Sequence, residues 1–321
     1  MGFNFKGAGL GLVEDFLVKV VEVLDRVVKD YSSVESILLS GGVDTSVLAC
    51  MFRRYFNFHA LVVGFGKDFP DLKYAKLVAK KLGLPFHVKI FNVKEALKAA
   101  EQVVKILKTF DPVEVRNDIP IYVGMKHLKK LGFNSVVTGD GGDELFAGYT
   151  FLFKFKPSKI DNWIKNIVKH WFFASKIFGE SLGLKVYQPF MDKRMVKLAL
   201  KIPAKYKVVE KDGIIYGKWI LREAFKNFLP SEVVWRPKNP IEMGSGSIRL
   251  ADVFHVNQKE FSDLSKIVRL KSMEQAYYLK LYLKNVGEIP KPKIGEKQCP
   301  NCGAGIRKNS NFCRICGTYL V

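Results

Sequence analysis

A turn that combines glycines with hydroxyl side chains follows the first apolar run of the chain. Residues 40–46 read Ser-Gly-Gly-Val-Asp-Thr-Ser, directly after Ile37-Leu38-Leu39 and before another apolar stretch. Glycines let the backbone approach a ligand closely, and the N–H groups at a helix N-terminus attract anions. An ordinary strand-to-helix turn is the alternative, and the complete string disfavours it. The candidate ligands for a phosphate or pyrophosphate group are Ser40, Gly41, Gly42, Thr45 and Ser46.

A second glycine-rich loop, at residues 138–149, carries three acidic side chains. It reads Thr-Gly-Asp-Gly-Gly-Asp-Glu-Leu-Phe-Ala-Gly-Tyr, so Asp140, Asp143 and Glu144 crowd together. Their charges repel one another, and Asp44 in the first loop would repel a phosphate, unless a divalent cation lies between them. A solvated acidic loop is the weaker alternative, because a predicted strand leads straight into it. The two loops therefore predict a magnesium–ATP site, with ATP and Mg²⁺ as the ligands.

Four of the five cysteines form two Cys-x-x-Cys pairs near the end of the sequence, Cys299 with Cys302 and Cys313 with Cys316. A glycine follows each pair, and four thiolates at this spacing predict a zinc ribbon around a structural Zn²⁺. Two disulfides are the alternative. They conflict with the reducing, cytoplasmic environment that the cysteine content indicates.

The segments around the two loops alternate between strand and helix patterns. An amphipathic helix over residues 11–31 leads into the first predicted strand. The predicted strands are 36–39, 59–64, 85–91 and 135–138, and the predicted helices are 43–55, 72–82, 94–107 and 119–131. This alternation indicates an α/β fold whose parallel sheet is covered on both faces. Ligands bind such sheets at the carboxyl ends of the strands, where both loops are placed.

The rest of the chain predicts a mostly helical part and a separate small domain. Residues 150–283 have helical patterns, and the stretch before the cysteines is rich in Pro, Lys and Gly, as linkers are. The expected domains are an N-terminal helix at 1–34, a nucleotide-binding domain at 35–283, a linker at 284–297 and the zinc ribbon at 298–321.

The chain is strongly basic, with 52 Lys and Arg against 31 Asp and Glu, a net charge of +21. This imbalance favours a polyanionic partner such as tRNA, although a lysine-rich thermophile surface is the alternative. Between residues 149 and 176 aromatic side chains interleave with lysines, which fits either base stacking or amphipathic helix packing. No apolar run reaches membrane-spanning length and no secretory pattern begins the sequence, so we expect a cytoplasmic protein with no membrane partner.

The two loops resemble sequence signatures of known enzymes. Residues 40–46 resemble the PP-loop of ATP pyrophosphatases, and together with residues 138–149 they resemble the paired signature of asparagine synthetase synthetase domains. Further matching strings are Asp111-Pro112 with Arg116, Pro189-Phe190-Met191-Asp192, residues 218–224 and Trp235-Arg236-Pro237-Lys238. The resemblance covers roughly residues 30–250. It implies an adenine nucleotide alpha hydrolase-like fold of the PP-loop, HUP type.

The resemblance also implies a two-step reaction. ATP adenylates a small-molecule carboxylate and pyrophosphate leaves from the residues of the first loop. Ammonia or an amine then displaces AMP and forms an amide. Asp44 and Asp143 occupy the family's magnesium-coordinating positions. Lys238 matches the lysine that meets the adenylate, and Lys218 matches the lysine on the pyrophosphate side.

Three further positions are implied to contact the nucleotide. Leu39 and Val63 fall where the family holds adenine through backbone groups, and Gly139 lies beside the α-phosphate or ribose. The family's catalytic Glu is Asp140 here, with a side chain one methylene shorter, and its implied role is that of general base toward the amine.

The start of the sequence departs from the family. Asparagine synthetases carry an N-terminal glutaminase domain whose nucleophile is the cysteine after Met1, whereas Gly2 follows Met1 here and no such domain precedes the PP-loop. We therefore expect nitrogen from free ammonia, from a separate glutaminase subunit or from an amine on the substrate.

Two other functions stay open at this point. A tRNA-modifying PP-loop ATP pyrophosphatase would bind RNA through its basic surface and zinc ribbon. Thiolation usually needs several cysteines outside the ribbon, and Cys50 is the one that this sequence has there. A non-catalytic nucleotide-binding partner subunit would recruit other proteins through the ribbon.

Overall fold

The computed structural model describes residues 11–320, which form two compact units. The first unit consists of residues up to 63, residues 70–89 and residues 124–240. The second consists of residues 64–69, residues 90–123 and the residues from 241 onward. The domain boundaries expected from the sequence stay a prediction, and residues 1–10 of the expected N-terminal segment lie outside the described residues.

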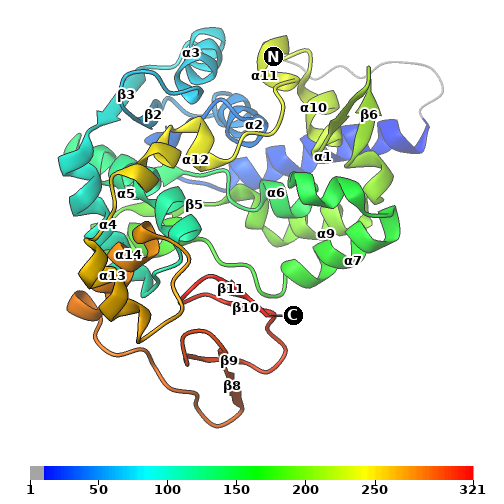
Figure 1. Cartoon of the computed structure of the whole chain (residues 1–321). Coiled ribbons are helices and arrows are strands. Elements are labelled where there is room, and N and C mark those ends of the chain that lie inside the picture. The colour runs from blue at the N-terminus through cyan, green and yellow to red at the C-terminus, as the bar shows by residue number, and fades with distance from the viewer. Residues whose placement is uncertain (1–10, 321) are drawn as a thin grey trace. The chain divides into compact units, whose positions relative to one another are not determined.

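The α/β fold contains a five-stranded sheet in the order β3-β2-β1-β4-β5. Figure 1 labels β2, β3 and β5 of this sheet. Its strands are β1 (Ser36–Leu38), β2 (His59–Phe65), β3 (Phe86–Phe91), β4 (Ser135–Val137) and β5 (Lys185–Tyr187). The central strand β1 runs parallel to both β2 and β4, and β4 runs parallel to β5. Because β1 and β4 are parallel neighbours, the loops that follow them leave the same edge of the sheet. This confirms the predicted parallel α/β fold.

Helices follow the strands in the predicted alternation. Those of the first unit are α1 (Leu12–Lys29), α2 (Val43–Phe52), α3 (Asp71–Leu82), α6 (Gly142–Leu145), α7 (Pro157–Ile167), α8 (Ala174–Leu182), α9 (Lys193–Lys201), α10 (Trp219–Phe225) and α11 (Ser231–Val234). Those of the second unit are α4 (Val93–Leu107), α12 (Ile241–Gly244), α13 (Gln258–Ser265) and α14 (Met273–Asn285), and α5 (Pro112–Lys130) has residues in both units. Short 3₁₀ helices are η1 (Thr150–Lys154), η2 (Pro189–Met191), η3 (Ala204–Tyr206) and η4 (Ser247–Asp252).

The helix α1 shows why the apolar spacing of the sequence produces this packing. Val20, Leu24, Val27 and Val28 are at most 1% exposed, and their spacing of three and four residues places them on one helix face. That face packs against α9 and α10. The predicted helix over residues 11–31 is therefore confirmed with its ends within two residues.

Two small β elements were missed in the part predicted to be mostly helical. The strand β5 joins the sheet through the register pair Ser135 with Lys185, and β6 (Val209–Lys211) pairs with β7 (Ile214–Tyr216) as an antiparallel hairpin. Each of these strands has three residues, which is too short for an alternating pattern to stand out. Helix α5 also begins earlier than predicted, at Pro112, because proline fits the first position of a helix.

The C-terminal ribbon of the second unit consists of two hairpins, β8 (Glu296–Gln298) with β9 (Gly305–Arg307) and β10 (Phe312–Cys313) with β11 (Thr318–Tyr319). Its second cysteine pair docks on the loop before α5, where the Phe110 N–H donates to the Ile315 carbonyl at 2.8 Å. The fully buried Gln275 on α14 donates from Nε2 to the Cys316 carbonyl at 2.9 Å. The ribbon is thus hydrogen-bonded to its own unit.

No helix among residues 11–320 combines the length and the apolar character that crossing a membrane requires.

Candidate active site

The loop of residues 40–46 joins β1 to α2, as predicted. Gly42 is the N-cap residue of α2, so the N–H groups of the first helical turn have no intrahelical acceptor. The Ser46 hydroxyl donates to the Gly42 carbonyl at 2.7 Å, and the hydroxyl oxygens of Ser40 and Thr45 lie 3.2 Å apart. Gly41 has φ +70°, and a Cβ there would lie 2.4 Å from the Ala75 backbone nitrogen. Only glycine fits this turn.

Glycines of the second loop let acidic and basic side chains approach its backbone. A Cβ on Gly142 would lie 2.5 Å from Asp44 Oδ1. A Cβ on Gly148 would lie 2.0 Å from Asp143 Oδ1 and 2.1 Å from Lys218 Cε. The two predicted loops therefore meet, and the glycines provide the space in which their charged side chains gather.

Two lysines and two aspartates form one chain of ion pairs at this edge of the sheet. Lys218 Nζ contacts Asp44 Oδ2 and lies 2.8 Å from Asp143 Oδ1. Lys238 Nζ lies 2.7 Å from Asp143 Oδ2. Lys218 is 3% exposed, so its charge interacts with the carboxylates away from bulk water. The structure thus brings together all four charged residues to which the sequence assigned roles at the phosphates.

One oxygen of each aspartate has no hydrogen-bond partner. Among the residues that the structure describes, Asp44 Oδ1 and Asp143 Oδ1 are buried and accept no hydrogen bond, although Asp143 Oδ1 lies 2.8 Å from the ammonium nitrogen of Lys218. Buried polar atoms normally have a hydrogen-bond partner, and carboxylate oxygens are the ligands that hard divalent cations prefer. The donor set therefore fits a divalent cation held by Asp44 and Asp143.

Burial and the neighbouring lysines shift the pKa values of this cluster. Burial raises the pKa of Asp44, and the charge of Asp143 adds to that effect against Lys218. Burial also favours a higher pKa for Asp143, but Lys218 and Lys238 outweigh it and hold that pKa below its usual range. Burial opposes the charge of Lys218, but Asp143 and Asp44 outweigh it and raise the pKa of the ammonium group. Lys218 and Asp143 are therefore charged at neutral pH.

Asp140 belongs to a different hydrogen-bond network. Its Oδ2 accepts from the Thr138 hydroxyl at 2.6 Å, from the Ser175 hydroxyl and from Gln188 Nε2 at 2.9 Å. The Gln188 amide also donates to the Ser175 hydroxyl at 3.2 Å. These hydrogen bonds of Asp140 thus go to residues outside the ion-pair chain. Ser175 and Gln188 escaped the sequence analysis because no local pattern marks them.

The predicted adenine-side positions lie on neighbouring strands. Leu39 directly follows β1 and donates its N–H to the Leu61 carbonyl of β2 at 2.8 Å, and Val63 lies further along β2. Gly139 lies against the first loop, since a Cβ there would lie 3.0 Å from Thr45 Cγ2. These three positions lie at the same edge of the sheet as the charged cluster.

Arg236 is a site residue that the sequence analysis named only as part of a matching string. Its guanidinium donates to the Ser40 carbonyl at 3.2 Å and to Asp71 Oδ1 at 2.7 Å, and it lies 4.0 Å from the centre of the Tyr74 ring. Arg236 therefore ties the first loop to α3. The sequence feature that could have marked Arg236 as a site residue is its position two residues before Lys238.

Glu144 and Tyr149 form a second buried pair that the sequence analysis did not assign. The Tyr149 hydroxyl donates to Glu144 Oε1 at 2.5 Å. Burial raises the pKa of Glu144 to about 7, against the lowering effect of this hydrogen bond. The Tyr149 ring lies under Lys238, whose Nζ is 5.8 Å from the ring centre. The pair therefore borders the ion-pair chain.

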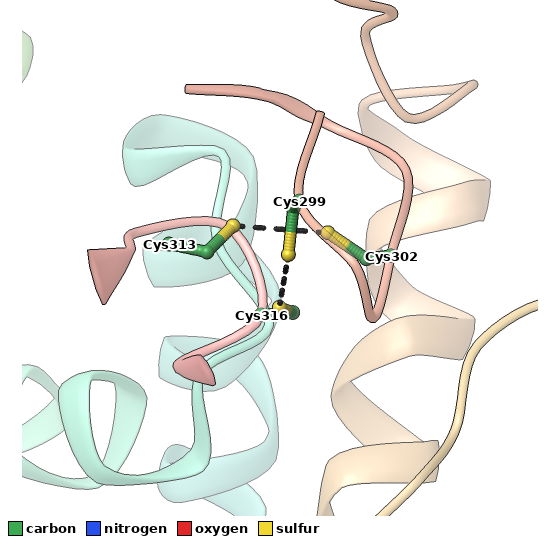
Figure 2. Close-up of side chains that lie close together, drawn as sticks. All are labelled: Cys299, Cys302, Cys313 and Cys316. Carbon is green, nitrogen blue, oxygen red and sulfur yellow. Dashed lines mark hydrogen bonds between the residues drawn. The ribbon is translucent and has the colours of Figure 1, made fainter. Parts of the chain in front are cut away.

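The four C-terminal cysteines form a compact cluster in the second unit (Figure 2). All are buried, and their sulfur atoms lie within 4.8 Å of one another. Cys299 and Cys316 are 3.7 Å apart at Sγ, and so are Cys302 and Cys313. A disulfide needs about 2.05 Å, whereas tetrahedral Zn–S bonds of about 2.3 Å place the sulfurs about 3.8 Å apart. The cluster fits Zn²⁺.

The fold and the two loops define an α/β nucleotide-binding domain followed by a zinc ribbon. Residues 22–180 and 179–285 match the family described as asparagine synthase, and residues 298–320 match the family described as zinc-ribbon domain. The chain therefore belongs to the asparagine synthase family, a family of ATP-dependent ligases. This confirms the family resemblance drawn from the sequence.

Curated relatives agree with this assignment. Glutamine-hydrolyzing asparagine synthetase from Sandersonia aurantiaca is 29% identical over 76% of this chain and 52% of its own length. Glutamine-hydrolyzing asparagine synthetase 1 from Lotus japonicus is 30% identical over 76% of this chain and 46% of its own. The chain thus spans about half the length of the curated relatives it matches.

Solved structures show weaker similarity. NMN synthetase from Francisella tularensis is 12% identical and has a TM-score of 0.40, with 88% of this chain and 99% of that chain covered. NH₃-dependent NAD synthetase from Campylobacter jejuni is 17% identical and has a TM-score of 0.31, with 60% and 98% covered.

Proposed function

We propose that this chain is an ATP-dependent ligase that adenylates a carboxylate and converts the acyl-adenylate to an amide. The observation that carries the proposal is the ion-pair chain of Asp44, Lys218, Asp143 and Lys238 between the loops after β1 and β4. The chain's family membership supports ligase chemistry at this position.

In the first step a substrate carboxylate oxygen attacks the α-phosphorus of ATP. The new oxygen–phosphorus bond forms while the bond to the β-phosphate bridging oxygen breaks, and pyrophosphate leaves with that electron pair. Negative charge develops on the α-phosphate and on pyrophosphate. Lys238 and Lys218 supply fixed positive charge there, and the loop of residues 40–46 supplies backbone and hydroxyl donors.

Asp44 and Asp143 would hold a magnesium ion through their Oδ1 atoms, neither of which accepts a hydrogen bond. The ion supplies Lewis-acid stabilisation of the phosphate oxygens. The ammonium group of Lys218 contacts both aspartates, so this side chain orients them before ligand binds.

In the second step an amine attacks the carbonyl carbon of the acyl-adenylate. The carbon–nitrogen bond forms, the carbon–oxygen bond to AMP breaks, and a proton leaves the nitrogen. Asp140 is our proposed acceptor of that proton, positioned by Ser175 and Gln188. The amine is free ammonia, ammonia from a separate glutaminase subunit, or an amine on the substrate.

Pyrophosphate release tests the proposal. The protein is incubated with Mg-ATP, ammonia and either aspartate or bulk tRNA, and pyrophosphate and AMP are measured. We expect aspartate, or another small carboxylate in a panel, to stimulate release. Release with tRNA alone would favour an RNA-modifying enzyme, and nucleotide binding without release under any condition would favour the non-catalytic subunit.

The role of Asp140 is tested by separating the two steps. Asp140→Asn keeps an oxygen for the Ser175 and Gln188 donors but cannot accept a proton, so amide formation should fall at least about 100-fold. Adenylation, followed by pyrophosphate–ATP exchange, should persist. Asp140→Glu serves as the conservative control. Equal loss of both steps in Asp140→Asn would contradict the assignment.

A further inference from the structure

A surface that combines lysines and aromatic rings begins at the candidate active site and continues along η1 and α7. We call it the aromatic–lysine surface, and its residues are Tyr149, Phe151, Lys154, Phe155, Lys156, Lys159 and Trp163. Tyr149 and Phe151 stack with ring centres 5.6 Å apart and planes inclined by 23°. Because Lys238 lies over Tyr149, the stack leads outward from the ion-pair chain.

Packing against a local core explains Tyr149, Phe155 and Trp163, and it leaves Phe151 and the lysines unexplained. Leu152, Ile160 and Ile164 are at most 3% exposed and form a local core. Phe151, in contrast, is 47% exposed, and its ring contacts Trp163 edge to face at 5.6 Å. A phenylalanine that keeps half its surface in water contributes little to the core. The exposed part of its ring is accessible to another planar group.

The lysines of this surface lack acidic partners. Lys154, Lys156 and Lys159 are exposed, and within the described part of the chain no carboxylate pairs with them. Asp161 is the one acidic residue in the sequence between residues 150 and 176, against six lysines. Lys159 Nζ lies 3.9 Å from the centre of the Phe155 ring. The surface therefore carries uncompensated positive charge beside the exposed ring of Phe151.

We propose that the aromatic–lysine surface binds single-stranded RNA and presents a carboxylate-bearing nucleotide to the ATP site. Lysines attract backbone phosphates, and a base stacks on an exposed aromatic face, which is how proteins hold single strands. An acidic peptide would pair with the lysines but has no counterpart for the face of Phe151. The presentation of the carboxylate rests on the proposed ligase function, whereas the RNA binding does not.

Binding of a fluorescent oligouridylate, followed by anisotropy over a series of salt concentrations, tests the proposal with the full chain. Phe151→Ala should weaken binding on the order of 5- to 150-fold, the loss expected for one stacked base. Phe151→Trp should retain binding. The double variant Lys154→Gln/Lys159→Gln should reduce the slope of log Kd against log salt by about 1.4, since each phosphate contact on a single strand contributes about 0.7.

Matched controls and a competitor separate this site from general charge effects. Lys80→Gln/Lys81→Gln removes two exposed lysines of α3 and should leave the Phe151-dependent part of binding unchanged. Polyglutamate should compete poorly. Equal binding of polyglutamate and RNA would favour an acidic peptide and overturn the proposal, as would wild-type RNA affinity in Phe151→Ala.

A second readout distinguishes this proposal from the proposed function. RNA that carries a carboxylate-modified nucleotide should stimulate pyrophosphate release, and Phe151→Ala should remove that stimulation while ATP binding persists. Absence of RNA binding by the wild-type protein, together with intact small-carboxylate turnover, would refute the RNA surface alone. RNA binding without pyrophosphate release from any carboxylate would refute the ligase function and with it the presentation step.

Discussion

Lys218 is the residue through which the charges of the site are arranged. It is the N-cap residue of α10 and has φ +56°, a left-handed conformation that is unfavourable for a side chain with a Cβ. From there its buried ammonium group reaches both Asp44 and Asp143. A strained backbone conformation at the candidate active site indicates that the position of the Lys218 side chain is needed there despite its conformational cost.

Asp44→Asn tests the metal assignment at the residue scale. An amide provides one weaker oxygen ligand in place of the carboxylate, so turnover should fall at least about 100-fold and the magnesium concentration for half-maximal activity should rise. Pyrophosphate release over a magnesium titration measures both. Asp15→Asn, an exposed residue of α1, is the matched control. Wild-type magnesium dependence in Asp44→Asn would contradict the assignment.

Glu144 predicts a pH dependence of stability. Its pKa of about 7 in the folded protein lies above the ordinary value of 4.5 for a glutamate, so the folded state binds the proton more tightly. Stability linked to this group is therefore complete below about pH 4.5 and decreases as the pH rises to about 7, by roughly 3 kcal/mol.

Glu144→Gln should remove this part of the pH dependence. Urea unfolding at pH 5 and pH 8 should show a smaller loss of stability for the variant than for the wild type, because the amide still accepts from Tyr149 without becoming charged. The exposed Glu180→Gln should behave as the wild type. An unchanged difference between the two pH values in Glu144→Gln would show that the carboxyl group ionises normally.

At the scale of elements, the site depends on two loops that approach each other so closely that a Cβ would not fit at some of their glycine positions. Both loops follow strands that are parallel neighbours in the sheet, so register alone places them at the same edge. The final approach depends on glycine. Gly142 lies against Asp44, and Gly148 lies against Asp143 and Lys218.

Gly148→Ala should therefore disturb the ion-pair chain without altering any charge. The new methyl group would overlap Asp143 and Lys218, and a displacement near 1 Å lowers catalysis about 100-fold. Pyrophosphate release and circular dichroism measure activity and folding. Gly11→Ala, where a Cβ meets nothing within 4 Å, is the control. Full activity in Gly148→Ala would mean that the loops tolerate separation.

At the scale of the whole molecule, the zinc ribbon is part of the second unit rather than a free tail. The carbonyl groups of residues 314, 315 and 316, in the second Cys-x-x-Cys segment, accept from Thr109, Phe110 and Gln275, respectively. Removing the ribbon would leave these buried donors unpaired, at about 1–3 kcal/mol each. The stability of α14 and of the start of α5 is therefore coupled to zinc.

Chelation of zinc should destabilise the segments that contact the ribbon as well as the ribbon itself. Hydrogen exchange after chelator treatment should speed up in residues 109–111 and in the first turn of α14, as well as in residues 298–320. Exchange in α1, which belongs to the first unit, should stay unchanged and provides the internal control. Faster exchange confined to residues 298–320 would contradict the coupling.

The sequence by itself determined the parts of the protein whose function depends on contiguous residues. A phosphate-binding turn needs glycines and donors next to one another, and a zinc ribbon needs paired cysteines, so both patterns were recognisable. The structure contains the glycine turn and the cysteine cluster, and phosphate binding stays a prediction. The alternation of apolar segments likewise predicted the parallel sheet. Strands of three residues, such as β5, were not predicted because three residues are too few to show an alternating apolar pattern.

Tertiary structure decided which distant residues complete the site. Lys218 lies 174 positions after Asp44 and Arg236 lies 196 positions after Ser40, so no local pattern could place either pair in contact. The fold also brings Ser175 and Gln188, which lie 35 and 48 positions further along the chain, to Asp140. Local composition specifies a phosphate turn or a metal cluster, whereas the electrostatics of the charged centre arise only when packing buries those groups together.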